Sequence, residues 1–155
     1  QGFLRQKDSN GNVILKKTDL DLSDVNAIKI NPEEGQNIVS GSHDEMMLAL
    51  QKKGIEYVLL TNKVDVSLLV KNRVYSLKLP NKTVHDTTGI GDIFCSAFTC
   101  TMLKEKDFLW ALCFAAGSAQ AALESNNVGL QKIPKKGMVE NNASYFYNLV
   151  DFRDL

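Results

Sequence analysis

The sequence contains few cysteines, prolines and histidines, and the small number of cysteines argues against a disulfide-rich or zinc-binding protein. Its 155 residues include three cysteines, three prolines and two histidines. Cys95, Cys100 and Cys113 form no C-x-x-C pair and all lie in an apolar helical pattern, so we expect buried free thiols rather than zinc ligands or disulfides. The odd number of cysteines, without a signal-like apolar segment in the first residues, favours a reducing, cytoplasmic setting.

The chain also lacks net charge and a long apolar run. Its 18 basic and 18 acidic residues give a formal net charge of zero. This balance argues against a nucleic-acid or anionic-membrane partner that is bound mainly by electrostatics. The most apolar stretch, Phe108–Leu123, is shorter than the ~20 residues of a membrane span and contains Gln120. We therefore expect a cytoplasmic protein with no nucleic-acid and no membrane partner.

Strands and helices are expected to alternate along the chain. Apolar and β-branched runs predict strands over residues 2–6, 13–17, 27–30, 57–61, 66–70 and 73–79. A short helix should open at Pro32, and longer ones should follow over residues 42–53, 92–104, 108–124 and 138–150. Ser42 and Asp107 are expected to cap two of these helices. This alternation predicts an α/β layered fold.

One stretch, HDTTGIGDIF beginning at residue 85, places hydroxyls, glycines and a carboxylate directly before a predicted helix. The first N–H groups of a helix lack intrahelical partners and, together with the helix macrodipole, attract an anion. Gly89 and Gly91 have no Cβ that would keep a phosphate away, and Thr88 supplies a hydroxyl. The stretch is no Walker loop, and Phe94 at the third glycine position excludes the dinucleotide fingerprint.

Asp92 is the unexpected member of this stretch, because a carboxylate repels a phosphate. A carboxylate at this position can act as a general base, which accepts a proton from a hydroxyl that is about to attack the phosphate. The alternative is that Asp92 is only the N-cap of the helix, a position that aspartate often occupies. The spacing of the residues alone favours neither interpretation.

The run Asp86-Thr87-Thr88-Gly89-Ile90-Gly91-Asp92 closely resembles the D-T-T-G-A-G-D signature of the ribokinase-like (pfkB) carbohydrate kinases. Only Ile90, in place of alanine, departs from it. The apolar helix that follows, and the alanine-rich helix around Ala116 with Gly129 after it, are also similar to the family. The resemblance implies an α/β, ribokinase-like layered fold, with a central, mostly parallel sheet flanked by helices.

The resemblance covers nearly the whole chain but only the C-terminal part of the family's fold. Full-length members are longer, and their N-terminal part supplies much of the sugar site and the lid. We therefore interpret residues 1–155 as a single domain, the nucleotide-side C-terminal portion of such a kinase. We expect either a homo-oligomer or a chain that needs a missing N-terminal half, and little or no kinase activity from this chain alone.

A second element, Asn31-Pro32-Glu33-Glu34, resembles the N-x-x-E pattern of the family. The resemblance implies that Glu34 acts near a magnesium ion through water, with Asn31 beside it. Taken alone, the four residues are only a helix start. Their position after a short predicted strand, upstream of the glycine loop, favours the metal role.

The chain departs from the family after the strand that ends near Thr61. Members have T-x-G-x-x-G there, whereas Lys63 and Val66 replace both glycines in this sequence. Those glycines lie close to the nucleotide in relatives, so the departure puts the affinity for ATP, or the identity of the nucleotide, in question. Lys63 is interpreted either as a phosphate contact or as an exposed turn residue.

The resemblance assigns a full set of site residues. Asp92 would be the general base, and the amides of Gly89, Ile90, Gly91 and Asp92 would form the anion hole. The residues expected to contact the nucleotide are Thr61, Lys63, Thr88, Gly89, Gly91, Ala116, Asn127 and Gly129. The implied cofactors are ATP and Mg²⁺, with a monovalent cation as a further candidate, and the implied partner is a small sugar-like acceptor.

Three functions compete at this point. The first is ATP-dependent phosphoryl transfer to a hydroxyl of a sugar or related small molecule. The second is a truncated or degenerate relative that binds a nucleotide or a partner without turnover, which the replaced glycines favour. The third, a flavodoxin-like phosphate or cofactor binder, explains the glycine loop but not the combination of Asp92 and Glu34.

Overall fold

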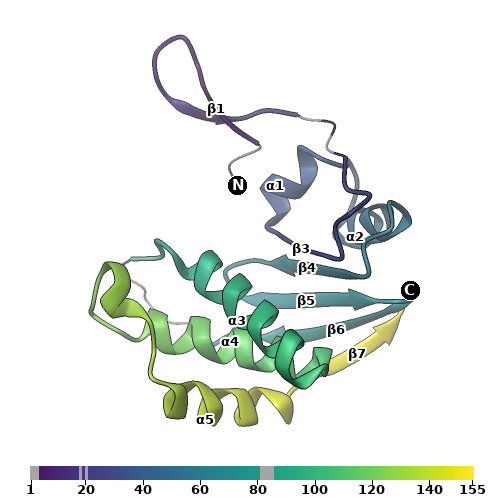
Figure 1. Ribbon diagram of the computed structural model, residues 1–155. Helices are drawn as coiled ribbons and strands as arrows, with labels where there is room; N and C mark the ends of the chain where they lie inside the picture. Colours follow the sequence, from purple (N-terminus) through teal and green to yellow (C-terminus); the bar gives the residue numbers. More distant parts are fainter. Residues whose placement is uncertain (1–3, 18, 20, 81–85) are drawn as a thin grey trace. The chain divides into compact units, whose positions relative to one another are not determined.

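The computed structural model describes residues 4–17, 19, 21–80 and 86–155 (Figure 1). The regular elements follow in the order β1 (Arg5–Lys7), β2 (Val13–Leu15), β3 (Ala27–Ile30), α1 (Pro32–Gln36), α2 (His43–Lys52), β4 (Tyr57–Thr61), β5 (Asp65–Val70), β6 (Arg73–Lys78), α3 (Ile90–Glu105), α4 (Phe108–Leu123), the 3₁₀ helix η1 (Gly129–Lys132), α5 (Lys136–Tyr147) and β7 (Asp151–Asp154). Residues 2, 3 and 85, which belong to a predicted strand and to the glycine motif, lie outside the described residues.

The strands form a five-stranded sheet in the order β3-β4-β5-β6-β7 and a separate pair, β1-β2. Strands β3 and β4 run parallel, with Ile30 opposite Leu60, whereas β4 and β5 run antiparallel, with Leu59 opposite Leu68. The predicted α/β class is therefore confirmed. The sheet is mixed rather than mostly parallel, because the tight turn after β4 returns the chain directly alongside it.

Packing divides the chain into two compact units, one of residues 1–75 with 152–155 and one of residues 76–151. Strand β6 leads from the first unit into the second, and β7 leads back. The expectation of a single domain over residues 1–155 stays a prediction. The two units are described separately below.

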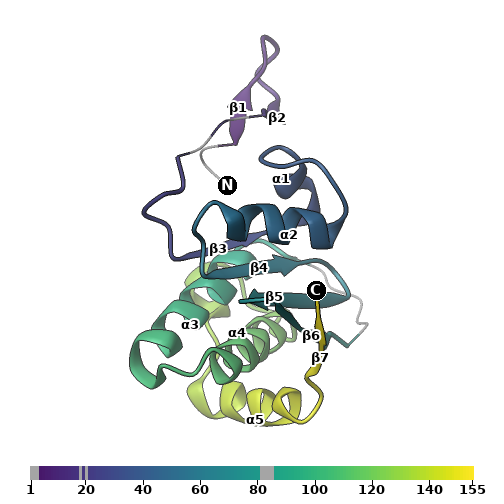
Figure 2. The same cartoon turned by 90° about the vertical axis from the view of Figure 1, so that its right-hand side faces the viewer.

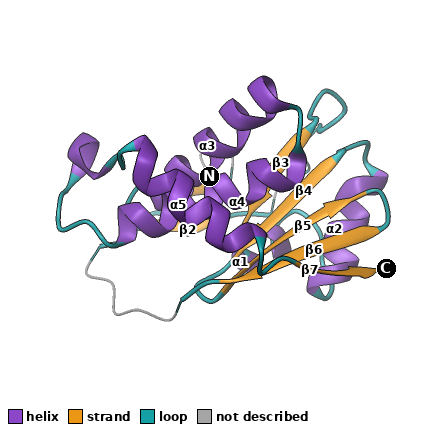
Figure 3. Ribbon diagram, turned by 90° about the horizontal axis from the view of Figure 1, so that it is seen from below, coloured by secondary structure: helices purple, strands orange, loops and turns teal. Residues whose placement is uncertain are grey.

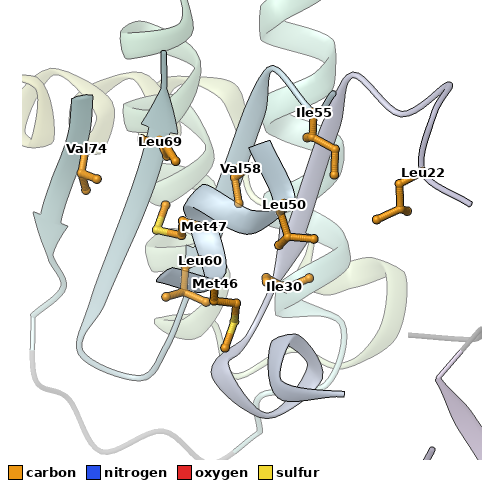
Figure 4. Close-up of a cluster of buried hydrophobic side chains, with 10 residues drawn as sticks. All are labelled: Leu22, Ile30, Met46, Met47, Leu50, Ile55, Val58, Leu60, Leu69 and Val74. Atoms are coloured by element: carbon orange, nitrogen blue, oxygen red, sulfur yellow. The ribbon is translucent and has the colours of Figure 1, made fainter. Parts of the chain in front are cut away.

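The core of the first unit lies between α2 and the strands that α2 contacts (Figures 2 and 4). Helix α2 begins with the predicted capping box, in which the Glu45 N–H donates to Ser42 Oγ and the Ser42 N–H donates to Glu45 Oε2. Its apolar face buries Met46, Met47 and Leu50 almost completely. This core supports β3 and β4, and the residues predicted to act at the magnesium ion and the nucleotide lie at or directly after the ends of these strands.

The described part of the second unit contains three α-helices, of which α4 contacts both α3 and α5 (Figure 3). Asp107 caps α4 as predicted, because its carboxylate accepts from the N–H groups of Leu109 and Trp110. Small side chains let α4 and α5 approach closely. A Cβ on Gly117 would lie 2.9 Å from both the Val139 carbonyl oxygen and the Ala143 nitrogen.

The expectation of three buried cysteines is wrong for two of them. Cys95 and Cys100 are exposed on α3, and only Cys113, on α4, is buried. Burial raises the pKa of the Cys113 thiol to about 12. The buried residues of α3 are Phe94, Phe98 and Thr101, which share one face of the helix, and both exposed cysteines lie off that face.

The last strand, β7, was not predicted from the sequence. All four of its residues are exposed, so it has no apolar pattern to detect. It pairs with β6 in the sheet, and two ion pairs join its side chains to other residues: Arg73 Nε lies 2.6 Å from Asp154 Oδ1, and Arg153 Nη2 lies 2.6 Å from Asp44 Oδ1. No helix in the described part of the chain is long and apolar enough to cross a membrane.

Candidate active site

The glycine motif forms a tight loop that leads into α3. Asp86 Oδ1 accepts from the Thr88 N–H at 2.8 Å, which turns the chain. Gly89 follows with φ at +77°, a conformation that residues with a Cβ adopt at a cost. A Cβ on Gly89 would meet no other atom within 4 Å, so the space beside the loop is open. The glycine is needed there for its backbone conformation.

Two of the backbone amides in this loop are available to a ligand. The Ile90 N–H donates to the Thr87 carbonyl at 3.3 Å, and the Asp92 N–H donates to the Gly89 carbonyl at 3.1 Å. The amides of Gly89 and Gly91 donate no hydrogen bond to any of the described residues. Unpaired amides at the positive end of a 16-residue helix favour a bound anion.

The interpretation of Asp92 as an N-cap is wrong. The N-cap of α3 is Gly89, which has no side-chain cap hydrogen bond, and the helix begins at Ile90, two residues before the predicted start. Asp92 is instead the third residue of the helix and is exposed. Its carboxylate makes no hydrogen bond or ion pair with any described residue. It is therefore free to accept a proton from a ligand.

Lys132, at the end of η1, was not singled out from the sequence. Its side chain is only 3 % exposed, and its Nζ contacts three oxygens of the glycine loop. These oxygens are the Asp86 carbonyl at 2.7 Å, Asp86 Oδ2 at 3.1 Å and the Thr88 carbonyl at 3.3 Å. The contacts join residues 44 and 46 positions apart in the sequence. A chain segment beyond α4 therefore supports the glycine loop.

The Asp86 carboxylate is held in its charged form by these neighbours. Hydrogen bonds from Thr88, together with the hydrogen bond and charge of the Lys132 ammonium, lower the pKa of Asp86 from its ordinary value of 3.8 to about 2. Asp86 therefore remains a carboxylate at every physiological pH. Its two oxygens have separate tasks, since Oδ1 bonds Thr88 and Oδ2 bonds Lys132.

The loop before Lys132 contains two of the predicted nucleotide contacts. Asn127 is exposed, but its Nδ2 donates to the Gln131 carbonyl at 3.2 Å, so the side chain also shapes the loop. Gly129 has φ at +60° and open space around it. Ala116 lies in the interior of α4 with none of its surface exposed, so its side chain offers no ligand contact.

In the first unit, Asn31 and Glu34 form a reciprocal capping box at the start of α1. Glu34 is 3 % exposed, and its Oε1 is buried without a hydrogen-bond partner in the described chain. An unpaired buried carboxylate oxygen suits a cation or a cation-bound water. Asn31 Oδ1 already accepts from the Glu34 N–H at 2.7 Å, so Asn31 holds Glu34 in place. Among the described residues, no group of three or more His, Cys, Asp or Glu could hold a metal ion.

The segment that departs from the family pattern forms the turn between β4 and β5. Asn62 closes this turn by accepting from the N–H groups of Val64 and Asp65. Lys63 lies exposed within the turn, whereas Val66 is 2 % exposed and belongs to the core. Thr61 Oγ1 donates to the Ile30 carbonyl at 3.4 Å, which links the ends of β3 and β4.

Comparison with known proteins assigns the chain to a family. A sequence model of the pfkB family of carbohydrate kinases matches residues 5–136, most of the chain. The chain belongs to the pfkB family. The matched residues include the glycine loop, Asp92, Lys132 and the Asn31–Glu34 pair. No curated protein sequence matches this pfkB chain.

Solved structures of kinases share its fold. A variant of a pyrophosphate-dependent myo-inositol-1 kinase matches with a TM-score of 0.73 at 18 % identity, over 95 % of this chain and 52 % of its own. The ribokinase of Thermotoga maritima matches with a TM-score of 0.67 at 19 % identity, over 77 % and 42 %. Arabidopsis thaliana ribokinase, solved with ribose and ATP, matches with a TM-score of 0.64 at 21 % identity, over 79 % and 42 %. The chain thus spans about half the length of these structures, or less.

Proposed function

We propose that this chain carries the phosphoryl-transfer machinery of a sugar kinase, which moves a phosphoryl group from ATP to a hydroxyl of a sugar or related small molecule. The observation that carries the proposal is the free, exposed carboxylate of Asp92 in the first turn of α3, beside the unpaired amides of Gly89 and Gly91. The Asp92 carboxylate is a proton acceptor and the two amides form an anion site, and phosphoryl transfer to a hydroxyl needs both.

The proposed reaction proceeds by direct transfer. The Asp92 carboxylate accepts the proton of the acceptor hydroxyl as that oxygen forms a bond to the γ-phosphorus. The bond between the γ-phosphorus and the bridging oxygen breaks, and ADP leaves with its electron pair. The amides of Gly89 and Gly91 donate hydrogen bonds to the phosphoryl oxygens, on which negative charge must be stabilised. The amides of Ile90 and Asp92 already bond within the loop and would have to share their hydrogens.

Magnesium is the cofactor that fits Glu34. The ion supplies charge neutralisation of the phosphates, and the buried Oε1 of Glu34 would hold one of its waters. Asn31 would act by fixing the Glu34 backbone and carboxylate. Thr61, Lys63, Thr88, Asn127 and Gly129 remain proposed contacts to the donor, while Ala116 is no longer proposed.

The phosphoryl donor has two candidates, ATP and pyrophosphate. Lys63 and Val66 replace the two glycines that lie close to the nucleotide in relatives, and Val66 is committed to the core. One structural neighbour uses pyrophosphate as its donor. Pyrophosphate is therefore the second candidate donor, and binding without turnover is the second candidate function, since the same two replacements favour it.

The test is a phosphorylation screen with the complete product of the gene that encodes this chain. Sugars, nucleosides and inositols are each incubated with Mg²⁺ and either ATP or pyrophosphate, and phosphorylated products are detected by mass spectrometry. We expect one acceptor class to be phosphorylated by one donor, and the Asp92→Asn variant to lose this activity. A folded protein that binds a donor but phosphorylates no acceptor would favour the non-catalytic alternative.

A further inference from the structure

Lys132 is buried, with 3 % of its surface exposed, although lysine is a residue that is ordinarily exposed. A buried ammonium group is costly unless its charge is paired and its N–H groups are satisfied. Lys132 meets both conditions, since the Asp86 carboxylate pairs its charge and two carbonyl oxygens complete the set. A carboxylate and two carbonyls are also the oxygens that suit a hard cation.

The number of hydrogen bonds that Lys132 makes decides whether its ammonium group can also contact a ligand. A lysine ammonium has three N–H donors, and the structure gives it three acceptors, all on Asp86 and Thr88. No donor is left over for a phosphate oxygen. Lys132 therefore acts on the glycine loop itself rather than on a ligand.

The contact with Thr88 has a specific consequence for the anion site. The carbonyl of Thr88 and the N–H of Gly89 belong to one peptide unit, which is planar and trans, so they point in opposite directions. When Lys132 holds the carbonyl at 3.3 Å, it sets the direction of the Gly89 N–H, one of the two unpaired amides. A cationic donor on the carbonyl also polarises the peptide and strengthens its N–H as a donor.

We propose that Lys132 is a built-in cation that positions the Thr88–Gly89 peptide to bind the transferred phosphoryl group. The inference rests on the proposed function, because it assigns a task to a residue that supports the same anion site. It makes Lys132 a positioning residue, since the ammonium reaches the reaction only through the loop. It also means that the loop needs no free monovalent cation to keep its shape.

The test measures donor binding, so that it does not depend on knowing the acceptor. The complete gene product and its Lys132→Ala variant are titrated with ATP and with pyrophosphate in a calorimeter. Loss of the charged hydrogen bonds should weaken binding about tenfold or more. Lys135→Ala is the matched control, because Lys135 is an exposed lysine three residues further on, and it should leave binding unchanged.

Chemical rescue separates positioning from a general loss of structure. Methylammonium chloride should restore much of the donor binding of Lys132→Ala, because it can fill the vacated space and donate hydrogen bonds to the same oxygens. Tetramethylammonium chloride at equal ionic strength should not, because it carries no N–H donor. Equal binding by Lys132→Ala and wild type, or a deficit that methylammonium leaves unchanged, would overturn the proposal.

If Lys132→Ala does not fold, a measurement on the wild type tests the proposal instead. The donor dissociation constant of the wild type should be the same in potassium chloride and in tetramethylammonium chloride, and a requirement for potassium would overturn the proposal.

Two outcomes distinguish this test from that of the proposed function. A wild type that binds donor but transfers no phosphoryl group contradicts the function alone, and the variant comparison still decides the role of Lys132. A wild type that binds neither donor overturns both.

Discussion

Asn31 and Glu34 hold each other through two hydrogen bonds, one from the Glu34 N–H to Asn31 Oδ1 at 2.7 Å and one from the Asn31 N–H to Glu34 Oε2 at 3.1 Å. This exchange uses one carboxylate oxygen of Glu34 and leaves the other, Oε1, buried and unpaired. The capping box therefore also holds a charge in place at the end of β3.

Glu34→Gln tests what the unpaired oxygen is for. The side-chain oxygen of glutamine can still accept from the Asn31 N–H, so the unfolding free energy should change by less than about 1 kcal/mol. The charge is lost, so the Mg²⁺ concentration needed for half-maximal activity of the complete protein should rise about tenfold, which corresponds to about 1.4 kcal/mol. Asn31→Ala removes the side chain that caps the helix, so it should lower the unfolding free energy by about 1 kcal/mol. An unaltered magnesium dependence in Glu34→Gln would show that the carboxylate has no metal role.

Gly89→Ala tests the open space beside the anion loop. With φ at +77°, an alanine should cost about 1–2 kcal/mol of unfolding free energy. Gly54→Ala is the matched control, because Gly54 also has positive φ, at +100°, and no atom within 4 Å of an added Cβ. Thermal unfolding should show a loss in both variants, whereas donor affinity measured by calorimetry should fall only in Gly89→Ala. Equal donor affinity in the two variants would place the phosphate elsewhere.

Gly117→Ala tests the close approach of α4 and α5. The added Cβ would lie 2.9 Å from two backbone atoms of α5, which cannot move as a side-chain tip can. We expect a loss of about 1–3 kcal/mol in unfolding free energy. Gly137→Ala, on α5, has open space and should stabilise the protein by about 0.5 kcal/mol through reduced backbone freedom in the unfolded chain. Denaturant unfolding that ranks the two variants in the opposite order would contradict the packing.

The contribution of Asp86 to stability should depend on pH in a defined window. Its pKa is lowered from 3.8 to about 2, so the folded protein holds the charged form more strongly than the unfolded chain does. The resulting stabilisation is fully present above about pH 4 and is lost as the pH falls towards 2. The difference in unfolding free energy between wild type and Asp86→Asn should therefore shrink over this window. A difference that stays constant from pH 7 to pH 2 would mean that the charge of Asp86 does not contribute.

The sequence predicted the parts of the fold that follow from local patterns. The capping box at Ser42, the cap at Asp107 and the buried strand at residues 57–61 each have a short-range signal, and each is present. The alternation of strands and helices also predicted the α/β class correctly. Strand β7 has no such signal, because its four residues are exposed and its partners, strand β6, Arg73 and Asp44, are far away in the sequence.

The candidate site was predictable only in part for the same reason. The glycine motif is contiguous, so it was visible, and the family assignment that it suggested is confirmed. Lys132 was not visible, because nothing local distinguishes it from Lys135 and Lys136. Its role becomes apparent only when contacts across 44 and 46 residues bring it to the loop. The exposure of Cys95 and Cys100 was missed because burial was expected for all the apolar residues of α3, whereas only the face with Phe94 and Phe98 is covered.

The most direct test of the account is the Asp92→Asn variant of the complete protein, assayed with the acceptor and donor that the screen identifies. Asparagine keeps the size of the side chain but cannot accept the hydroxyl proton, so kcat should fall by about 10² to 10⁴. Donor affinity should be unchanged or slightly higher, because a negative charge is removed from beside the anion site. Near-normal turnover in Asp92→Asn would contradict the account.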